Sequence, residues 1–491
     1  MSLIDLCEDV LIHIINQASD KNKIKLMKTC HKLYSLREHV QYTGKYEYNR
    51  VKNLKFSDKF CNITFHFNSK IHTIKSIPLG TRRIIFDKYF NQDITDLNLS
   101  NIEQIEFGRD FNQSIIGKLP KTIKCIVFGE KFNQPVIGAF PDSIQRIIFG
   151  HDFDQPVIGA FPDKTKYIIF GFRFNQPILG AFEYSIEHLV FGHEFDQPID
   201  DALPPNLKHL VFRGKFNQKI KNNIPHGVSH LEFGSAFNRS IRNALPNTIR
   251  YLKTGNGFNR NVSQCFPKGL LHLVLGSNFN FSLAMCLPKT LLSLRLGRNF
   301  NQYLKFSLPK NLTHLYFDDD SIYNRSLRDC LPDSLQHIEF GNIYNYSIEN
   351  IFHNGLKTII FGSMFNQPIY KTFLAGKNYF GFSKCQVKKF IPDTVEYIDF
   401  GFCFDQNIYK ALPNNLITVI FGDCFNKDIK KSIPISTKNL TIGRMYQCSL
   451  KKNIPNTLTT LTLPEGTLIN NAKYIPKNIH IKINSPRYND Y

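Results

Sequence analysis

The sequence lacks several features that would place it outside the cell interior or in a membrane. It has no Trp, no Cys-x-x-Cys pair and no apolar run of membrane-spanning length. Its first ten residues carry Asp5, Glu8 and Asp9 and no basic segment, so we expect no secretory signal. The 11 cysteines are an odd number and are scattered, which favours reduced thiols. We therefore expect a cytoplasmic protein, with the nucleus as the alternative, and no membrane partner.

Patterns that carry catalysis are also missing. The chain has no Gly-x-Ser-x-Gly elbow, no phosphate-cradling Gly-Lys-Ser/Thr loop and no His-Glu-x-x-His. We expect that the protein is not an enzyme and that it holds no cofactor and no metal.

The charge is strongly unbalanced, with 61 Lys and Arg against 40 Asp and Glu, a formal net charge of +21. Such an excess could attract nucleic acid, an anionic membrane or an acidic protein. The basic residues are spread along the chain, however, and the longest clusters are pairs such as Lys388-Lys389 and Lys430-Lys431. We interpret them as a generally basic surface, and nucleic-acid binding is the least favoured hypothesis.

Phe is abundant, with 44 residues, and its spacing is periodic. The aromatic that opens a Phe-Asn-Gln-Pro signature recurs every 21 residues from Phe90 to Phe300. One step of 23 leads to Tyr323, and its two extra residues lie in Asp318-Asp319-Asp320. The period resumes through Tyr344 and Phe365, and again at Phe404, Phe425 and Tyr446. The chain is therefore an array of repeats.

The step from Phe365 to Phe404 is 39 residues long. We interpret it as containing a degenerate repeat, because Phe380-Gly381-Phe382 resembles an earlier strand end. Cys385 and Gln386 would then take the Asn and Gln places of the signature. Further worn repeats are expected near Phe67-Asn68 and between Leu461 and Ile469.

Each unit carries the pattern Leu207-x-x-Leu210-x-Phe212 followed by the signature, which is close to the leucine-rich-repeat pattern. The period of two predicts a short strand with one buried face. Gly at the strand end is expected to let the backbone turn, and a Pro nine residues after the signature Phe breaks the return segment. The fold class is therefore a solenoid of about 18 coils of 21 residues, with stacked parallel strands and little or no convex helix.

Stacking places equivalent residues in columns. The two Phe columns should fill the core. Asn91, Asn112 and Asn133 share a column with Asp154 and Asp196. Because Asn and Asp have only an acceptor oxygen in common, we expect this column to accept backbone N–H bonds in the turn.

Two columns should lie on the exposed, concave face of the strands. One is polar and the other apolar, where side chains act either as strand formers or as a binding surface. Stacked His could share a metal, but no Cys or carboxylate column accompanies them, so exposed polar surface is the expectation. His272, His314 and His337 hold the same place further on. The concave strip predicted to bind a partner consists of Val127, Ile148, Ile169, Val190, Val211, Tyr167, His188, His209 and His230.

The first 45 residues do not follow the repeat. Leu6, Val10, Leu11, Ile14 and Ile15 have helical spacing, and after a break at Ser19-Asp20-Lys21-Asn22 a second helical pattern continues to Leu33. We expect a helical module in residues 1–45, a connector in 46–66, the solenoid in 67–480 and a tail in 481–491.

The segment from Leu6-Cys7-Glu8-Asp9-Val10-Leu11 through Cys30-His31-Lys32-Leu33 resembles an F-box, with Cys7 and Leu33 where that family usually has Pro and often has Trp. The repeat resembles the FNIP repeat, a relative of the leucine-rich repeat. F-box and FNIP-repeat proteins of giant DNA viruses and social amoebae share this layout.

The resemblance implies a substrate receptor in which the F-box docks onto the adaptor subunit of an SCF-type cullin–RING ubiquitin ligase. The solenoid would hold an unknown target protein, in the host cytoplasm if the chain is viral. The alternative is a stand-alone protein-binding scaffold whose helices only cap the solenoid. The residues that the resemblance assigns to the adaptor contact are Leu6, Val10, Leu11, Ile14, Ile15, Leu26 and Cys30.

Overall fold

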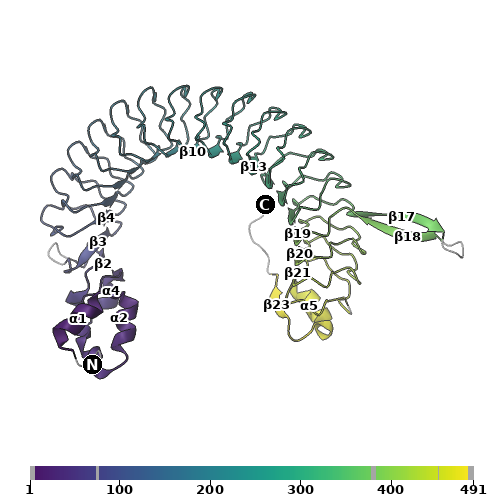
Figure 1. Cartoon of the computed structure of the whole chain (residues 1–491), viewed down its shortest axis with the longest axis horizontal. Helices are drawn as coiled ribbons and strands as arrows, with labels where there is room; N and C mark the ends of the chain where they lie inside the picture. Colours follow the sequence, from purple (N-terminus) through teal and green to yellow (C-terminus); the bar gives the residue numbers. More distant parts are fainter. Residues whose placement is uncertain (1–5, 73–76, 378–382, 452, 485–491) are drawn as a thin grey trace. The chain divides into compact units, whose positions relative to one another are not determined.

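A computed structural model describes residues 6–72, 77–377, 383–451 and 453–484. The chain forms two compact units (Figure 1), Met1–Lys219 with Pro225–Val228, and Ile220–Ile224 with Ser229–Tyr491. Within each unit, short strands lie along one side of the stacked coils and turns along the other (Figure 1). Among the described residues, none of the helices combines the length and the apolar character that a membrane crossing requires.

The first unit opens with short helices: α1 (Glu8–Asn16), α2 (Asp20–Met27), α3 (His31–Ser35), η2 (Leu36–Glu38), α4 (Tyr48–Val51) and η3 (Ser57–Lys59). The prediction of one helix continuing to Leu33 is wrong, because the chain turns between α2 and α3. Thr29 ends α2 locally: its backbone N–H and its hydroxyl both donate to the Leu26 carbonyl, at 3.0 and 2.6 Å. A Thr side chain that bonds to a nearby backbone carbonyl in this way replaces a helical hydrogen bond and disfavours a further helical turn.

The strands of the first unit pair in parallel in chain order. They are β1 (Tyr46–Glu47), β2 (Ile63–Phe67), β3 (Thr81–Phe86), β4 (Gln104–Glu106), β5 (Cys125–Val127), β6 (Arg146–Ile148), β7 (Tyr167–Ile169), β8 (His188–Val190) and β9 (His209–Val211). From β4 onward each residue pairs with the residue 21 positions later, for example Ile147 with Ile168. The sheet begins in residues 46–66, the segment that the sequence assigns to a connector.

The second unit repeats this arrangement. Its strands are β10 (His230–Glu232), β11 (Tyr251–Lys253), β12 (His272–Val274), β13 (Ser293–Leu296), β14 (His314–Phe317), β15 (His337–Glu339), β16 (Thr358–Ile360), β19 (Tyr397–Asp399), β20 (Thr418–Ile420), β21 (Asn439–Thr441), β22 (Thr460–Leu463) and β23 (His480–Ile483). The helices α5 (Glu465–Asn471) and η4 (Ala472–Tyr474) follow β22. The predicted fold class, parallel coils of about 21 residues with little helix, is confirmed.

The long step between Phe365 and Phe404 contains an inserted hairpin. Strands β17 (Tyr370–Lys377) and β18 (Ser383–Lys389) pair antiparallel with each other, while β16 pairs directly with β19, Thr358 opposite Tyr397. The interpretation as a degenerate repeat is therefore wrong: one coil is interrupted by 18 extra residues. Phe380, Gly381 and Phe382, which suggested it, lie outside the described residues.

Two stacked columns of Phe rings fill the core, as predicted. Phe111, Phe132 and Phe153 are fully buried, and consecutive rings lie 6.0 and 6.1 Å apart. Each also stacks on the strand-end Phe of its own coil, at 3.9 Å for Phe149 and Phe153. Each signature ring lies between the rings of the two adjacent coils, so stacking of the coils is what buries it.

The Asn column accepts backbone N–H bonds, as predicted, but the bonds run between coils. The Asn112 backbone N–H donates to Asn91 Oδ1 at 2.8 Å, and that of Asn175 donates to Asp154 Oδ1 at 2.9 Å. The signature Gln adds a second bond to the same oxygen, 2.9 Å from Gln176 Nε2 to Asp154. Asp serves as well as Asn because only the oxygen is used.

The strand-end glycines have a different role from the expected one. Gly129 and Gly150 are not in the left-handed region, so they do not serve a turn that only Gly can make. A Cβ on Gly150 would overlap the carbonyl oxygen of Gly129 in the preceding coil. These glycines are needed because coil backbones touch there. The left-handed glycines are others, with φ of 70 to 76° at Gly117, Gly138, Gly159 and Gly180.

Candidate functional site

The helical module and the first strands share one hydrophobic core. Leu11 and Ile15 of α1, at 0 and 1% exposure, pack in a cluster that also holds Phe60 and Ile63 beside and on β2. The remaining buried members are Met27, Leu33, Leu36, Val40, Tyr42 and Val51. The helices therefore cover the first coil and are fixed to it.

The residues assigned to the adaptor contact divide into inner and outer groups. Val10 and Ile14, one helical turn apart on α1, are 42 and 39% exposed. Leu6, Leu26 and Cys30 are half-buried against the core. Leu11 and Ile15 lie inside it, so we revise their expected role from touching a partner to holding α1 in place. Both sides of α1 are apolar, which is why helical spacing alone did not separate the two groups.

A buried ion pair fastens α2 to the segment before β1. The Lys23 ammonium, with 1% of its side chain exposed, lies 3.1 Å from Asp20 Oδ1 and donates to the Gln41 carbonyl at 2.6 Å. Asp20 also accepts from the Gly44 backbone N–H at 2.6 Å and from the Tyr46 hydroxyl at 2.9 Å. Every buried charge is thus matched by a partner, which is the condition for such a pair to be tolerated.

This network sets the titration of its members. Burial by itself would raise the pKa of Asp20, but the hydrogen bonds from Gly44, Lys23, Tyr46 and Thr43 together hold that pKa below its usual value. Burial, with the hydrogen bond to the Asp20 carboxylate, raises the pKa of Tyr46 to about 12. The carboxylate is therefore charged and the phenol neutral throughout the physiological range.

The strand face of the first unit brings the two predicted columns together. The Tyr167 ring stacks on His188 at 4.2 Å, and His188 on His209 at 5.4 Å. Beside them the apolar residues stand in register at the third position of β5 to β9, and all are half-buried. In this part of the face, the aromatic row of Tyr167, His188 and His209 therefore lies next to an aliphatic row.

Ion pairs between coils border this face. Lys208 lies 2.7 Å from Glu187, and Lys166 lies 3.7 Å from the same carboxylate. The hydrogen bond from Lys208 lowers the pKa of Glu187. Since these side chains are exposed, the pairs add little stability, but they give the apolar rows a charged rim.

The strand face of the second unit is more polar. His230, from the predicted strip, stacks on Tyr251 at 4.3 Å and lies 2.9 Å from Glu232. Further along, the His314 and His337 rings lie 5.7 Å apart and are tilted relative to each other. Burial, with repulsion from His337 and His272, lowers the pKa of His314. In the part of the chain that the structure describes, no three His, Cys, Asp or Glu side chains are grouped to hold a metal ion.

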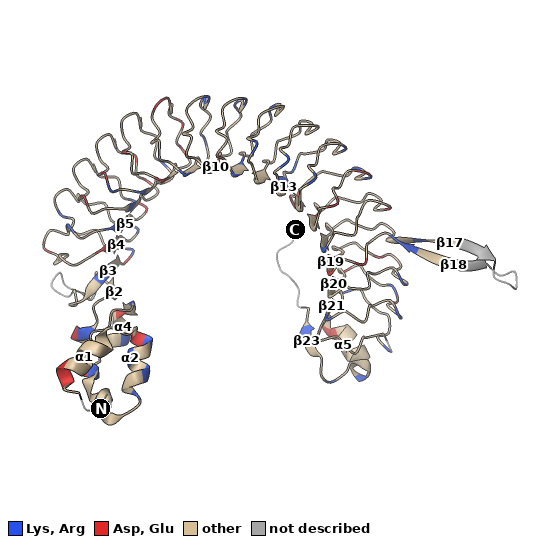
Figure 2. Cartoon of the chain, viewed as in Figure 1, with Lys and Arg blue, Asp and Glu red and all other residues tan. Residues whose placement is uncertain are grey.

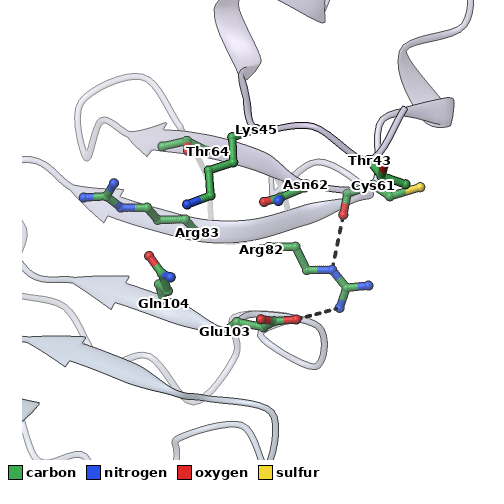
Figure 3. Close-up of a pocket in the computed structure, with 9 residues that line it drawn as sticks. All are labelled: Thr43, Lys45, Cys61, Asn62, Thr64, Arg82, Arg83, Glu103 and Gln104. Carbon is green, nitrogen blue, oxygen red and sulfur yellow. Dashed lines mark hydrogen bonds and ion pairs between the residues drawn. The ribbon is translucent and has the colours of Figure 1, made fainter. Parts of the chain in front are cut away.

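A pocket of about 340 Å³ lies where the helical module meets the first coils (Figure 3). Arg82 Nε donates to the Cys61 carbonyl at 3.2 Å, and its guanidinium lies 4.0 Å from Glu103. Arg83 pairs with Glu106 at 2.8 Å, and Lys45 also lines the pocket. Sequence reasoning missed this site, because Lys45 and the Arg82-Arg83 pair are far apart along the chain.

A second apolar row was also missed. It runs along the turns of the first unit and consists of Ile116, Ile137, Ile158 and Leu179, which are 47, 51, 50 and 63% exposed. The signal was the run of two aliphatic residues and a Gly after the signature, in which the first aliphatic residue is buried and the second is not. This row is more exposed than the apolar column of the strand face.

Comparison with known proteins agrees with the fold. The FNIP repeat model matches residues 100–352 and 404–466, more than half of the chain. A solved structure titled as CroV588, a novel circular LRR protein, is 29% identical, with a TM-score of 0.63 over 87% of this chain and 73% of that one.

Two relatives come from Acanthamoeba polyphaga mimivirus. A protein named as F-box and FNIP repeat-containing, R286, is 39% identical over 109 residues, covering 20% of this chain and 37% of its own length. A protein named as an F-box protein, L168, is 37% identical over 90 residues, covering 18% of this chain and 42% of its own length. The chain thus spans about two fifths of these relatives. With the repeat model matched over most of its coils, this chain belongs to the FNIP repeat family.

Proposed function

We propose that this chain is a substrate receptor that joins a target protein to an SCF-type cullin–RING ubiquitin ligase in the cytoplasm of a host cell. The observation that carries the proposal is the helical module. It exposes Val10 and Ile14 on α1 while Leu11 and Ile15 anchor the same helix in the core shared with the solenoid. A partner bound to α1 would therefore be held rigidly relative to the first coils. The F-box names of the relatives support this assignment.

The test is affinity capture of the tagged chain from Acanthamoeba lysate, followed by mass spectrometry. The variant Val10→Asp with Ile14→Asp places charge on the exposed side of α1 and leaves the core intact, so it should lose the adaptor and cullin. The matched control is Leu54→Asp, an equally exposed aliphatic residue of the same region at 39%. Circular dichroism verifies that both variants fold. Undiminished cullin recovery by the folded double variant would contradict the proposal.

The solenoid's part in this proposal is to hold the target, and the strand face of the first unit is the expected surface. Replacing Tyr167 and His188 with Glu puts charge into the aromatic row without changing the buried face of β7 and β8. Proteins captured by the wild type and lost only from this variant are the candidate targets. Tyr251 and His272, which pair at the first positions of β11 and β12 and lie outside the predicted strip, provide a matched control pair.

A second candidate function has its own support. Because the helices share a core with Phe60 and Ile63, they also serve as a cap, and capping alone would suit a stand-alone protein-binding scaffold. This function would be favoured if the intact, folded chain captured specific partners but neither the adaptor nor the cullin.

A further inference from the structure

Cations gather on the turns of the second unit, at a few fixed positions of the repeat. In the five coils that begin at Phe237, Phe258, Phe279, Phe300 and Tyr323, the second, third, fifth and sixth residues after the aromatic hold six cations and one carboxylate, Asp329. We name these positions the basic turn surface. Its cations are Arg239, Arg242, Arg260, Lys305, Arg325 and Arg328.

The same positions in the first unit show that the repeat does not require this charge. In the coils beginning at Phe111, Phe132, Phe153 and Phe174 they hold Gln, Ser, Pro, Gly and aliphatic residues, and no charged residue. The coil geometry is alike, since equivalent rings lie 6.0 to 6.1 Å apart there and 6.1 to 6.2 Å apart in the second unit. The charge therefore belongs to the surface of these coils rather than to the fold.

Two of the guanidiniums are held in place by backbone carbonyls of the Asn column. Arg260 occupies the place of a signature Gln, and its Nε donates to the Asn238 carbonyl at 2.9 Å. Arg325 does the same to the Asn301 carbonyl at 2.8 Å. A hydrogen bond from Nε to a neutral carbonyl orients the guanidinium without neutralising its positive charge. An oriented, charged guanidinium can bind a phosphate through two parallel N–H bonds.

Exposed aromatic rings occupy the same turns as these cations. Phe281, Tyr303 and Phe306 are 40, 68 and 76% exposed, and the Arg325 guanidinium lies 4.4 Å from the centroid of Tyr303. A hollow of about 550 Å³ is lined by Arg242, Arg260, Phe281 and by Ser240, Asn259, Asn261, Ser263 and Gln264. It offers two cations, several amide and hydroxyl donors and one ring.

We propose that the basic turn surface binds single-stranded nucleic acid, with phosphates on Arg242 and Arg260 and bases stacked on Phe281 and Tyr303. Sites for single-stranded nucleic acid combine two elements: cations along the path of the phosphate backbone, and exposed aromatic rings on which the bases stack. An acidic protein would use the cations but has no need of the rings. Figure 2 shows basic residues on the turns of the second unit as well as on its strands. This activity is separate from ligase recruitment, which depends on α1.

The experiment is fluorescence anisotropy of labelled U20 and dT20 with the full-length chain between about 0.05 and 0.3 M salt. We expect salt-sensitive binding that weakens about tenfold or more in Arg242→Glu with Arg260→Glu, with a shallower salt slope because two phosphate contacts are lost. Phe281→Ala should weaken binding about tenfold while keeping the wild-type salt slope, since it removes stacking and no charge.

The matched control is Lys268→Glu with Lys289→Glu, which makes the same charge change at exposed residues of the same coils, outside the basic turn surface. It should change the affinity less than threefold. Equal losses in both double variants, or no salt-sensitive binding by the wild type, would overturn the proposal. Two further results would overturn it. One is a duplex that binds as tightly as U20 and whose binding is unaffected by Phe281→Ala, and the other is polyglutamate that competes for the chain as well as unlabelled U20 does. Binding of one or both single strands, lost as described, supports it.

Discussion

At the scale of single residues, the two glycines of one coil illustrate how different physical demands select the same amino acid. Gly150 sits where the backbone of one coil touches that of the next. Gly159, nine residues on, has φ of 73° and nothing near its missing Cβ. In later coils Asp201, Asn243 and Met285 occupy the equivalent left-handed position with φ of 50, 53 and 58°. The second position thus accepts side chains without a change of backbone. The first is Gly in most coils, and where it is not, as at Arg213 and Asp318, the coils cannot have the Gly-on-Gly backbone contact seen at Gly150.

We expect Gly150→Ala to destabilise the protein by about 3 kcal/mol, because the backbones of adjacent coils must separate. Gly159→Ala should lower the free energy of unfolding by less than about 1 kcal/mol, since the left-handed strain is partly offset by the reduced entropy of the unfolded chain. Urea unfolding followed by circular dichroism measures both. Similar losses in the two variants would contradict the contact-based explanation for Gly150.

These residues also show how far a sequence can be interpreted column by column. Asp at position 154 of the Asn column correctly predicted that an acceptor oxygen is used, because Asp has that oxygen and lacks the amide donors of Asn. A row of Gly carries less information. It shows that a side chain is disfavoured, but not whether the reason is the backbone dihedral angle or a neighbouring backbone.

At the scale of elements, the helical module depends on the ion pair that ties α2 to the segment before β1. We expect Asp20→Asn to destabilise the module by about 3 kcal/mol at neutral pH, because Lys23 stays buried without its counter-charge. Asp58→Asn, which affects an exposed pair with Lys59, should have an effect below about 0.5 kcal/mol.

The pH dependence of this effect has a definite sign. The pKa of Asp20 is lower in the folded state than the value of about 3.9 expected when unfolded. Its contribution is therefore fully present above the unfolded value and is lost as pH falls through the folded one. The difference in unfolding free energy between wild type and Asp20→Asn should stay constant from about pH 7 to 5 and shrink below about pH 4. A difference that grows in acid would contradict this assignment.

The inserted hairpin is an element that the coil next to it does not need. Removing residues 371–388 restores the 21-residue step from Phe365 to Phe404 and returns Pro392 to nine residues after the signature Phe. We expect this deletion to change the melting temperature by less than about 3 °C, because β16 and β19 already pair directly. Removing residues 407–424, also 18 in number, breaks the register and should prevent folding. Circular dichroism melts distinguish the two outcomes.

Elements were harder to predict than columns for a physical reason. In the repeat, each buried position recurs many times, so one exceptional residue does not obscure the pattern of its column. The helical module and the hairpin occur once. On α1, Val10 and Leu11 are equally apolar although one faces solvent and the other the core, and hydrophobic spacing has no means of ranking them. The adaptor contact therefore remains a prediction for Val10 and Ile14.

At the scale of the whole molecule, stacking turns sequence distance into surface pattern. Cations that are dispersed along the chain suggested a uniformly basic surface. A period of 21 residues, however, places equivalent residues of neighbouring coils side by side, as the core Phe rings show at about 6 Å from centroid to centroid. The same operation gathers the aliphatic row of Ile116 to Leu179 on the turns of the first unit. Net charge and composition are averages over such columns, so they describe this molecule less well than the register does.

The same stacking determines how far along the solenoid a core substitution should destabilise the coils. Phe153 is fully buried, and its ring stacks between those of Phe132 and Phe174 in the adjacent coils, with ring centroids 6.1 Å apart in both pairs. We expect Phe153→Ala to remove about 3–5 kcal/mol through the cavity it leaves. Since each coil is stabilised by its neighbours, hydrogen exchange measured by mass spectrometry should accelerate in β5 to β8 and fade with distance, leaving β20 to β22 unchanged. Phe425→Ala should give the reverse map. Uniform acceleration along the chain in either variant would show instead that the coils unfold as one cooperative block, whatever their separation.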